Sequence, residues 1–207
     1  ESQSRLWENL IGRSLPFWKH YFPQAQKAFP EALGKVDLNT FYRSANTVAP
    51  SLIRVEADEV TYNLHIMLRF ELEQDLIRGK ISVDDLPREW NDRMENWLGI
   101  RPSNDSDGVL QDIHWSLGAI GYFPTYALGN LMSTQLFDAA KRAIPDLDSK
   151  TERGDFSDLL QWLRKSVHHH GRRKSSGQIL KDATGSDLSA DSWMQYVHAK
   201  FGDLYGF

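Results

Sequence analysis

Cysteine is absent from the 207 residues, and no run of about 18 apolar residues occurs. Without cysteine the chain can form no disulfide and no thiolate metal site, so any metal would be bound by histidine and carboxylate side chains. Without a long apolar run, we expect no helix that spans a membrane. The formal net charge of -4 disfavours a nucleic-acid-binding protein, because such proteins usually carry a basic excess. No signal segment is recognisable, which together with the lack of cysteine indicates a cytoplasmic protein.

The composition is that of a folded, mainly helical protein. Hydrophobic residues make up 41% and charged residues 25% of the sequence, which is typical of a globular chain. Apolar residues recur at helical spacing through most of it. We therefore predict an all-α fold in which residues 1–207 form a single helical unit. Alternation at Leu52, Ile53 and Val55 predicts a small β element near residues 47–57.

Two long helices are predicted in the middle of the chain. From residue 58 the apolar residues first alternate as in a strand, but leucines then recur at every fourth position as far as Leu76. The length of the segment 58–79 favours a helix of about 20 residues over a strand. A second helical stretch is predicted at residues 83–98.

The first residue, Glu1, stands three positions before the start of a predicted helix at residues 4–11. A native protein rarely begins inside an element of secondary structure, so we expect an artificial or proteolytic boundary here. Taken alone, a glutamate at the start of a helix would only complement the helix dipole.

An arginine and an aspartate accompany the predicted β element. Arg54 lies in Ile-Arg-Val-Glu-Ala-Asp at 53–58, and Asp58 stands where the next helix begins. Arginine binds carboxylates through two parallel hydrogen bonds, so Arg54 is a candidate for anion binding. The alternative is a surface ion pair between Arg54 and Glu56 or Asp58.

The segment from Gly108 to Trp115 contains Gln111, Asp112 and His114. A carboxylate can orient an imidazole, which could then donate a hydrogen bond to a developing oxyanion. The same residues could instead form a structural turn network.

A turn rich in glycine and aromatic residues follows at 118–126. Its glycines allow the backbone to come close to a ligand, and Tyr122 and Tyr126 place two phenols near the start of the next helix. A tyrosine hydroxyl can stabilise an oxyanion without carrying a charge of its own. An aromatic corner of the core is the alternative.

Three consecutive histidines, 168–170, look like a metal-binding tract. Successive residues of a helix point about 100° apart, so three in a row cannot all bind one ion there. We expect them to interact with the helix C-terminus or to fill local space.

Taken in order, these segments resemble the Taq-type thermostable carboxypeptidase family, whose members are zinc-dependent enzymes. That family carries His-Glu-Ser/Gly-Gln, Ile-Arg-x-x-Ala-Asp and Gly-x-x-Gln-Asp-x-His-Trp motifs. The sequence has Glu-Ser-Gln at 1–3, Ile-Arg-Val-Glu-Ala-Asp at 53–58 and Gly-Val-Leu-Gln-Asp-Ile-His-Trp at 108–115. The similarity continues at 121–126 and 204–207, so it covers essentially the whole chain.

The resemblance implies the C-terminal part of a metallocarboxypeptidase, which hydrolyses the last peptide bond of peptides. Glu1 matches the glutamate that binds the metal together with two histidines of a His-Glu-x-x-His helix. Arg54 would bind the free α-carboxylate of the peptide, and Tyr122 would lie beside the substrate. His114 and Tyr126 would polarise the scissile carbonyl and stabilise the tetrahedral intermediate.

The resemblance also implies that Gln111, Asp112 and Asp58 support these side chains without touching the reacting atoms. One family motif is missing, because no His-Glu-x-x-His occurs among the 207 residues. The general base and two metal ligands are therefore absent, and one carboxylate cannot hold catalytic zinc. We expect zinc or cobalt in the full-length parent, and we expect this chain alone to bind zinc weakly or not at all and to be inactive.

Two functions follow from these features. The first is part of an enzyme that acts on peptides with a free C-terminus and, as the family implies, forms a homodimer. The second is a non-catalytic helical module that binds peptide C-termini. The intact motifs at 53–58 and 108–115 favour the first. The surface that would meet the missing part is expected to expose apolar residues.

Overall fold

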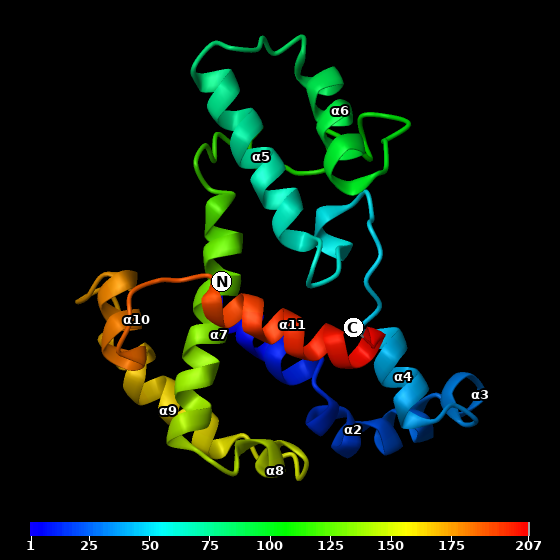
Figure 1. The fold of residues 1–207 in the computed structure, drawn as a ribbon, viewed down its shortest axis with the longest axis vertical. Helices are drawn as coiled ribbons and strands as arrows, with labels where there is room; N and C mark the ends of the chain where they lie inside the picture. The colour runs from blue at the N-terminus through cyan, green and yellow to red at the C-terminus, as the bar shows by residue number, and fades with distance from the viewer. Residues whose placement is uncertain (207) are drawn as a thin grey trace. The chain divides into compact units, whose positions relative to one another are not determined.

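The structure, a computed structural model, describes residues 1–206 and consists of helices joined by turns (Figure 1). No β-strand occurs among these residues, so the all-α prediction is confirmed. The helical elements, in chain order, are α1 (Ser2–Arg5), η1 (Leu6–Gly12), α2 (Leu15–Ala28), α3 (Pro30–Leu33), α4 (Leu38–Ala45), η2 (Arg54–Glu56), α5 (Tyr62–Ile77), α6 (Leu86–Leu98), α7 (Pro124–Ala143), α8 (Leu147–Thr151), α9 (Ser157–Ser166), η3 (His168–His170), α10 (Ser176–Thr184) and α11 (Asp191–Tyr205).

The chain forms two compact units. Unit 1 comprises Glu1–Asn46 and Leu128–Phe207, and unit 2 comprises Thr47–Ala127. Within residues 1–206, every helix falls short of the length or the apolar character that crossing a lipid bilayer requires.

Unit 2 is built around a hairpin of α5 and α6. Leu68 and Leu72 of α5 have no exposed surface, and Trp90 and Met94 of α6 are almost completely buried. In both helices these residues stand four positions apart, so they share one face and pack against the other helix. Both helices predicted in this region are thus present, at slightly narrower bounds than expected.

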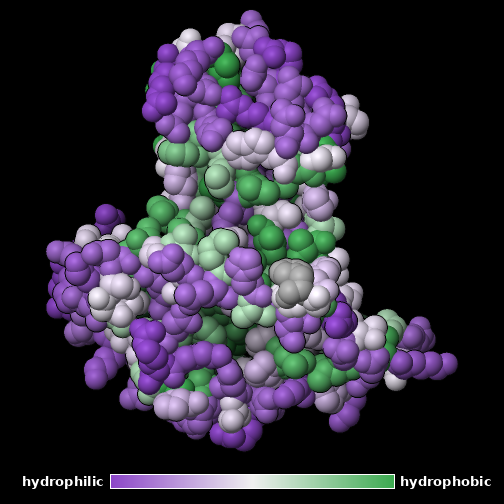
Figure 2. Space-filling view, in the orientation of Figure 1, coloured by the Kyte–Doolittle hydropathy of each residue, from purple (hydrophilic) through white to green (hydrophobic). Residues whose placement is uncertain are grey.

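The two helices of this hairpin are also joined by charged side chains. Arg93 of α6 donates to Asp75 of α5, with 2.6 Å between Nη2 and Oδ2. The end of unit 2 where α5 and α6 are connected is mainly hydrophilic, as Figure 2 shows. The buried leucines, Trp90 and Met94 therefore lie between the two helices, while the outer end of the hairpin is mainly hydrophilic and also exposes Ile77 and Val83.

The predicted β element near residues 47–57 is wrong. Arg54–Glu56 form a 3-10 turn, in which the Glu56 N–H donates to the Ile53 carbonyl at 3.1 Å. Ile53 itself has an extended backbone, with φ -94° and ψ 116°, which accounts for the strand-like pattern. The Arg54 N–H bonds to the side chain of Gln111 at 2.8 Å rather than to a neighbouring strand. The alternation of Leu52, Ile53 and Val55 therefore does not mark a strand, because no strand occurs among residues 1–206.

Unit 1 has a core of aliphatic side chains from its N-terminal helix and from α7 to α10. The buried members of this core are Leu6, Leu10, Ile11, Leu136, Ala140, Ile144, Leu147, Leu159, Leu163 and Leu180. The helix predicted at 4–11 is present, but its second part, η1, has the wider π-helical turn. Helix α10 was not predicted; Ser175 and Gln178 begin it with a reciprocal capping box.

The first residue packs closely against α7 inside unit 1. A Cβ atom at Gly129 would lie 2.6 Å from the Cβ of Glu1 and 3.2 Å from the Glu1 carbonyl carbon. Real Cβ atoms essentially never come as close as 2.6 Å to another carbon, so a glycine is needed at this point of α7. Gly129 thus allows Glu1 to approach the helix.

The substitution Gly129→Ala should lower the free energy of unfolding by about 1–3 kcal/mol, because the added methyl overpacks this contact. The matched control is Gly177→Ala in α10, where an added Cβ meets no atom within 4 Å. That control should be neutral or stabilising by up to ~1 kcal/mol, because alanine favours the helix. Urea denaturation of both variants checks the prediction, and equal stabilities would contradict the contact of Glu1 with α7.

Candidate functional site

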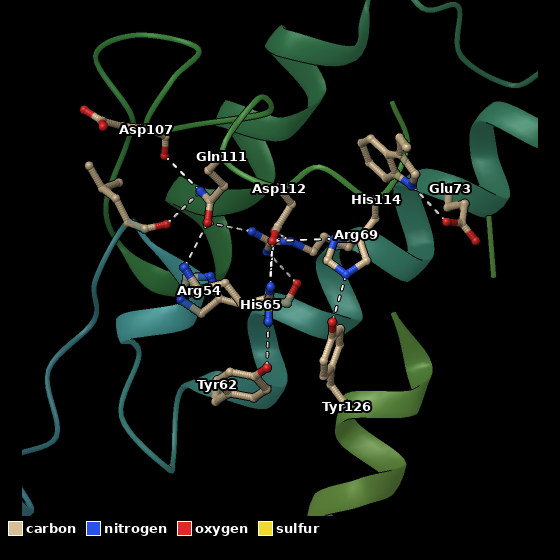
Figure 3. Close-up of polar contacts among 12 residues, drawn as sticks. Arg54, Tyr62, His65, Arg69, Glu73, Asp107, Gln111, Asp112, His114 and Tyr126 are labelled. Atoms are coloured by element: carbon tan, nitrogen blue, oxygen red, sulfur yellow. Dashed lines mark hydrogen bonds and ion pairs between the residues drawn. The ribbon is translucent and has the colours of Figure 1, made fainter. Parts of the chain in front are cut away.

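Arg54 lies at the start of η2 and is buried, with 5% of its surface exposed. Its Nε and Nη2 donate to the carboxylate of Asp112, with 2.6 Å between Nη2 and Oδ1. Its Nη1 donates to the hydroxyl of Tyr62 at 2.7 Å, and its guanidinium lies 4.7 Å from the ring centre of Tyr126 (Figure 3). The ion pair of Arg54 is therefore with a carboxylate 58 residues further along the chain, not with one of its own motif.

Asp112 is held between two guanidinium groups. Its Oδ2 accepts a hydrogen bond from Nε of Arg69 at 2.7 Å, and its Oδ1 accepts from Arg54. Burial alone would raise the pKa of Asp112, but the hydrogen bond from Arg54 and the charge of Arg69 outweigh it and hold this pKa below its usual value. Burial would likewise lower the pKa of Arg54, but the hydrogen bond to Asp112 reverses the effect and raises it. All three groups therefore stay charged at neutral pH.

Arg69, in α5, has no exposed surface. Its Nη1 donates to the carbonyl of His65 and its Nη2 to the side-chain oxygen of Gln111, both at 2.8 Å. Its guanidinium also lies 4.5 Å from the ring centre of Trp90. Burial lowers the pKa of Arg69 to about 10, against the opposing effect of Asp112, so the side chain keeps its charge at neutral pH.

The sequence reasoning missed Arg69, although a signal exists. An arginine within a helix is usually solvated, and burial without a partner would be costly. In α5, however, position 69 lies three residues before Leu72 and seven before Leu76, so it falls on the face that these leucines define. A charged residue on the apolar face of a predicted helix would have indicated a buried ion pair.

Gln111 ties three segments of unit 2 together. Its Oε1 accepts from the backbone N–H of Arg54 and from Nη2 of Arg69, both at 2.8 Å. Its Nε2 donates to the carbonyls of Leu52 and Asp107, both at 3.0 Å. The amide thereby uses both of its donors and both acceptor positions, which fixes η2, α5 and the 108–115 segment against one another.

His114 and Tyr126 form a direct pair, with 2.9 Å between His114 Nε2 and the tyrosine hydroxyl. The half-exposed ring of Tyr122 lies beside both, at 5.7 Å from the His114 ring and 5.6 Å from the Tyr126 ring. The Nδ1 of His114 is 3.7 Å from Oδ1 of Asp112, which is too far for a hydrogen bond. Asp112 therefore acts on the imidazole through its charge.

The charges around His114 favour its neutral form. Burial lowers the pKa of His114; the charge of Asp112 opposes this shift, and those of Arg54 and Arg69 add to it. The imidazole is therefore neutral at pH 7 and can donate one hydrogen bond and accept another.

Asp58 orders the backbone that leads into α5. Its Oδ1 accepts from the N–H groups of Val60 and Thr61 at 2.8 and 2.9 Å. Its Oδ2 accepts from the Thr61 hydroxyl at 2.7 Å and from the N–H of Ala49 at 3.2 Å. The side chain thus holds both ends of the segment that contains Arg54.

Glu1 belongs to unit 1, whereas the other candidate residues belong to unit 2. It is exposed at the start of α1. In the part of the chain that the structure describes, no group of three or more histidine, aspartate or glutamate side chains is placed to hold a metal ion. A catalytic zinc site needs about three protein ligands, so the residues present do not make up such a site by themselves.

The histidine tract does not form a metal site either. His168–His170 lie in the 3-10 turn η3, and the Nε2 of His168 is 3.0 Å from the side-chain oxygen of Gln3. His169 is exposed and His170 is partly buried. His168 therefore links the tract to α1 through its contact with Gln3.

The bonded network in unit 2 has one more positive than negative charge, since Arg54 and Arg69 share Asp112. The contacts of Arg54 leave one N–H on each of its two terminal nitrogens for a further acceptor. A carboxylate suits this pair of donors in charge and in geometry. The neutral His114–Tyr126 pair lies in the same unit, and its mutual bond leaves one donor hydrogen for a further acceptor.

The segment that carries His114 also exposes several large apolar side chains. Each is more than half exposed, and they are Leu110, Ile113, Leu117 and Ile120. Large apolar side chains exposed close together in sequence are typical of a surface that another molecule or segment covers.

Comparison with known proteins identifies the family of this helical chain. The profile of the family described as Carboxypeptidase Taq (M32) metallopeptidase matches residues 1–201. The chain therefore belongs to the M32 carboxypeptidase family, as the resemblance predicted.

Characterised relatives and solved structures agree with this assignment. Thermostable carboxypeptidase 1 of Thermus thermophilus is 48% identical over 206 residues, which are 100% of this chain and 40% of that protein. Carboxypeptidase 1 of Bacillus subtilis is 44% identical over 99% of this chain and 41% of its own length. The crystal structure of an M32 carboxypeptidase from Deinococcus radiodurans has a TM-score of 0.96 at 48% identity, over 100% of this chain and 42% of that one. The chain thus spans about 40% of the length of the relatives it matches.

His65 of α5 is completely buried below this network. Neither ring nitrogen has a hydrogen-bond partner among the described residues. Burial lowers the pKa of His65 to about 4; Arg69 and Arg54 add to the shift, and Asp112 and Asp58 oppose it. Between pH 6.5 and about 4, His65 is therefore neutral in the folded chain but protonated in the unfolded chain.

His65 should make the protein less stable as the pH falls from 6.5 towards 4. The unfolded state binds the proton first in this window, so unfolding is favoured, by roughly 3 kcal/mol at pH 4 relative to pH 7. The variant His65→Leu should lack this part of the pH dependence, whereas the control His169→Ala, at an exposed position, should keep it. Urea denaturation at pH 7, 6, 5 and 4 checks this, and parallel curves for wild type and His65→Leu would contradict it.

Proposed function

We propose that this chain supplies the carboxylate-binding and carbonyl-polarising side chains of a metal-dependent carboxypeptidase that hydrolyses the last peptide bond of peptides. Residues 1–207 would form the C-terminal helical part of that enzyme. The proposal rests on the buried Arg54, which lies in the same unit as the His114–Tyr126 pair. Arg54 and Arg69 share the one carboxylate of Asp112, so this network carries a surplus positive charge. An exopeptidase of this type needs both a cation for the terminal α-carboxylate and neutral donors for the adjacent carbonyl.

Arg54 would bind the α-carboxylate through the N–H groups that Asp112 and Tyr62 leave available. The bond from Asp112 keeps the guanidinium in one orientation, which lowers the entropy lost when a substrate binds. Recognition of the terminal carboxylate sets the register of the peptide, so that the last peptide bond is the one placed for hydrolysis.

His114 and Tyr126 would act as a pair on the scissile carbonyl oxygen as it gains negative charge. If His114 Nε2–H donates to the tyrosine oxygen, the tyrosine O–H is left to donate to the carbonyl oxygen. Their mutual bond of 2.9 Å holds both groups before the substrate arrives, and such preorganisation is what makes oxyanion donors effective. Tyr122, at the exposed edge of the same aromatic group, would contact the substrate.

The metal of the parent enzyme would be zinc or cobalt, with Glu1 as one of its ligands. Its remaining ligands and the general base would come from residues outside this chain. The parent would be a cytoplasmic homodimer. The chain alone would be inactive, because it has no group of three potential metal ligands among the residues described.

A chimaera tests the proposed activity. In it this chain replaces the matching part of thermostable carboxypeptidase 1 of Thermus thermophilus, to which it is 48% identical over 206 residues. The chimaera should release C-terminal amino acids from peptides, and this chain alone should release none. C-terminal amidation should abolish the reaction, because no carboxylate is left for Arg54.

Two variants of the chimaera test the role of Arg54. Arg54→Lys keeps the positive charge but loses the planar pair of donors, so KM should rise by roughly tenfold to hundredfold. Arg88→Lys, at an exposed position of α6, is the matched control and should leave KM unchanged. Equal rates on free and amidated peptides would contradict the proposed role.

Metal analysis tests the proposed incompleteness of the site. After incubation with zinc and dialysis, the isolated chain should retain far less than one equivalent of zinc, because catalytic zinc needs about three protein ligands. The chimaera under the same treatment should retain one equivalent. Stoichiometric zinc in the isolated chain would overturn the prediction.

A further inference from the structure

Glu73, in α5, is a buried carboxylate that the proposed chemistry does not use. It is 5% exposed, and each of its two oxygens accepts a hydrogen bond. Oε2 accepts from the indole N–H of Trp115 at 2.8 Å, and Oε1 accepts from the backbone N–H of Gly121 at 2.6 Å. Both are short bonds to an acidic side chain, which places them among the stronger hydrogen bonds in proteins.

The two donors stand at the two ends of one loop. Residues 116–122 between and beside them are mostly exposed, and Gly118 and Gly121 have the left-handed φ values of 71° and 78°. Such a segment has few apolar contacts of its own, so its conformation depends on the bonds at its ends. Glu73 therefore closes the loop by binding Trp115 and Gly121 at once.

This loop carries the candidate site residues at its two ends. His114 immediately precedes Trp115, and Tyr122 immediately follows Gly121. Within the loop, the Ala119 N–H donates to the carbonyl of His114 at 2.8 Å. A displacement of either end would therefore move the imidazole or the phenol directly.

Arg69 binds the residues that precede His114 in the chain. Arg69 and Glu73 are four residues apart in α5, so they lie on one face of the helix. Arg69 binds Gln111 and Asp112, whereas Glu73 binds Trp115 and Gly121. One helical turn of α5 thus fixes the segment on both sides of His114 (Figure 3).

If Glu73 served only to give the indole N–H of Trp115 a hydrogen-bond partner, a single acceptor would be enough. The indole N–H of Trp115 requires one acceptor, which a neutral side chain could provide. The second oxygen of Glu73 instead binds a backbone N–H six residues further along, in a loop that is otherwise exposed. We propose that Glu73 is a positioning residue, whose carboxylate closes the 115–121 loop and thereby fixes His114 and Tyr122 in the site. The placement stands on the contacts of this chain; its catalytic consequence rests on the proposed function.

The isosteric variant Glu73→Gln tests the placement in this chain. Glutamine replaces one of the two acceptor oxygens by an NH2 group, which only donates, so one of the two N–H groups loses the oxygen that it faces. In two-dimensional NMR spectra, the signals of the Trp115 indole N–H, the Gly121 amide and the His114 ring should shift or broaden. The Nε–H signals of Arg54 and Arg69, which report their bonds to Asp112, should stay in place.

Glu71→Gln is the matched control on the same helix. The side chain of Glu71 is half exposed and lies 3.7 Å from Arg93, so its substitution should leave the His114 and Tyr122 signals unchanged. A second variant, Trp115→Phe, removes one donor and keeps the carboxylate, and it should shift the Gly121 amide less than Glu73→Gln does. Unchanged His114 and Tyr122 signals in Glu73→Gln would overturn the proposal. Loss of the Arg54 and Arg69 signals as well would also overturn it, because Glu73 would then stabilise the whole unit.

The chimaera separates the positioning role from the proposed function. There, Glu73→Gln should lower kcat by about tenfold to hundredfold, because the carbonyl donors are misplaced. KM should stay within about twofold, because Arg54 keeps its partners. A chimaera that is inactive even with Glu73 would contradict the proposed function, while the NMR result on this chain would still decide the placement. A rise in KM with unchanged kcat would contradict the positioning of the carbonyl donors.

Discussion

The arrangement of unit 2 depends on the carboxylate of Asp112 held between the guanidinium groups of Arg54 and Arg69. Burial of one carboxylate and two arginines is unfavourable unless each charge is paired and hydrogen-bonded. Here both oxygens of Asp112 accept bonds, and the side chain of Gln111 binds both arginine segments. Removal of any one of these groups would leave the others buried without a full set of partners, so the network acts as a unit.

This network explains why a turn, rather than a strand, carries the substrate-binding candidate. The backbone N–H of Arg54 bonds to a glutamine side chain and the guanidinium bonds to Asp112, so the segment is fixed by side chains. The 3-10 turn brings the N–H of Arg54 to Gln111 and its guanidinium to the adjacent residue, Asp112. The surplus positive charge that results is consistent with binding of an anionic group, and it does not depend on residues outside the unit.

Helix α5 organises the site although none of its side chains is proposed to touch a substrate. Its buried stripe mixes leucines, which pack on α6, with Arg69 and Glu73, which bind the loop on the other side of the site residues. Through Arg69 and Glu73, a helix that packs in the core also binds and orders the segment 111–121. Such a support lies away from the reacting atoms and is held by the same packing that stabilises the unit.

The sequence by itself determined the helical class, the bounds of α5 and α6 within a few residues, and the family, because apolar periodicity and ordered motifs are local properties. It also indicated the residues that the structure brings together, since Arg54, Gln111, Asp112, His114 and Tyr126 all lie in or near those motifs. Only the tertiary structure decided that Arg54 pairs with Asp112, that η2 is a turn, and that Arg69 and Glu73 are buried partners of the loop. The physical reason is that a charged residue has the same local sequence pattern whether it faces water or a buried partner, and the partners here lie about forty to sixty residues away in sequence.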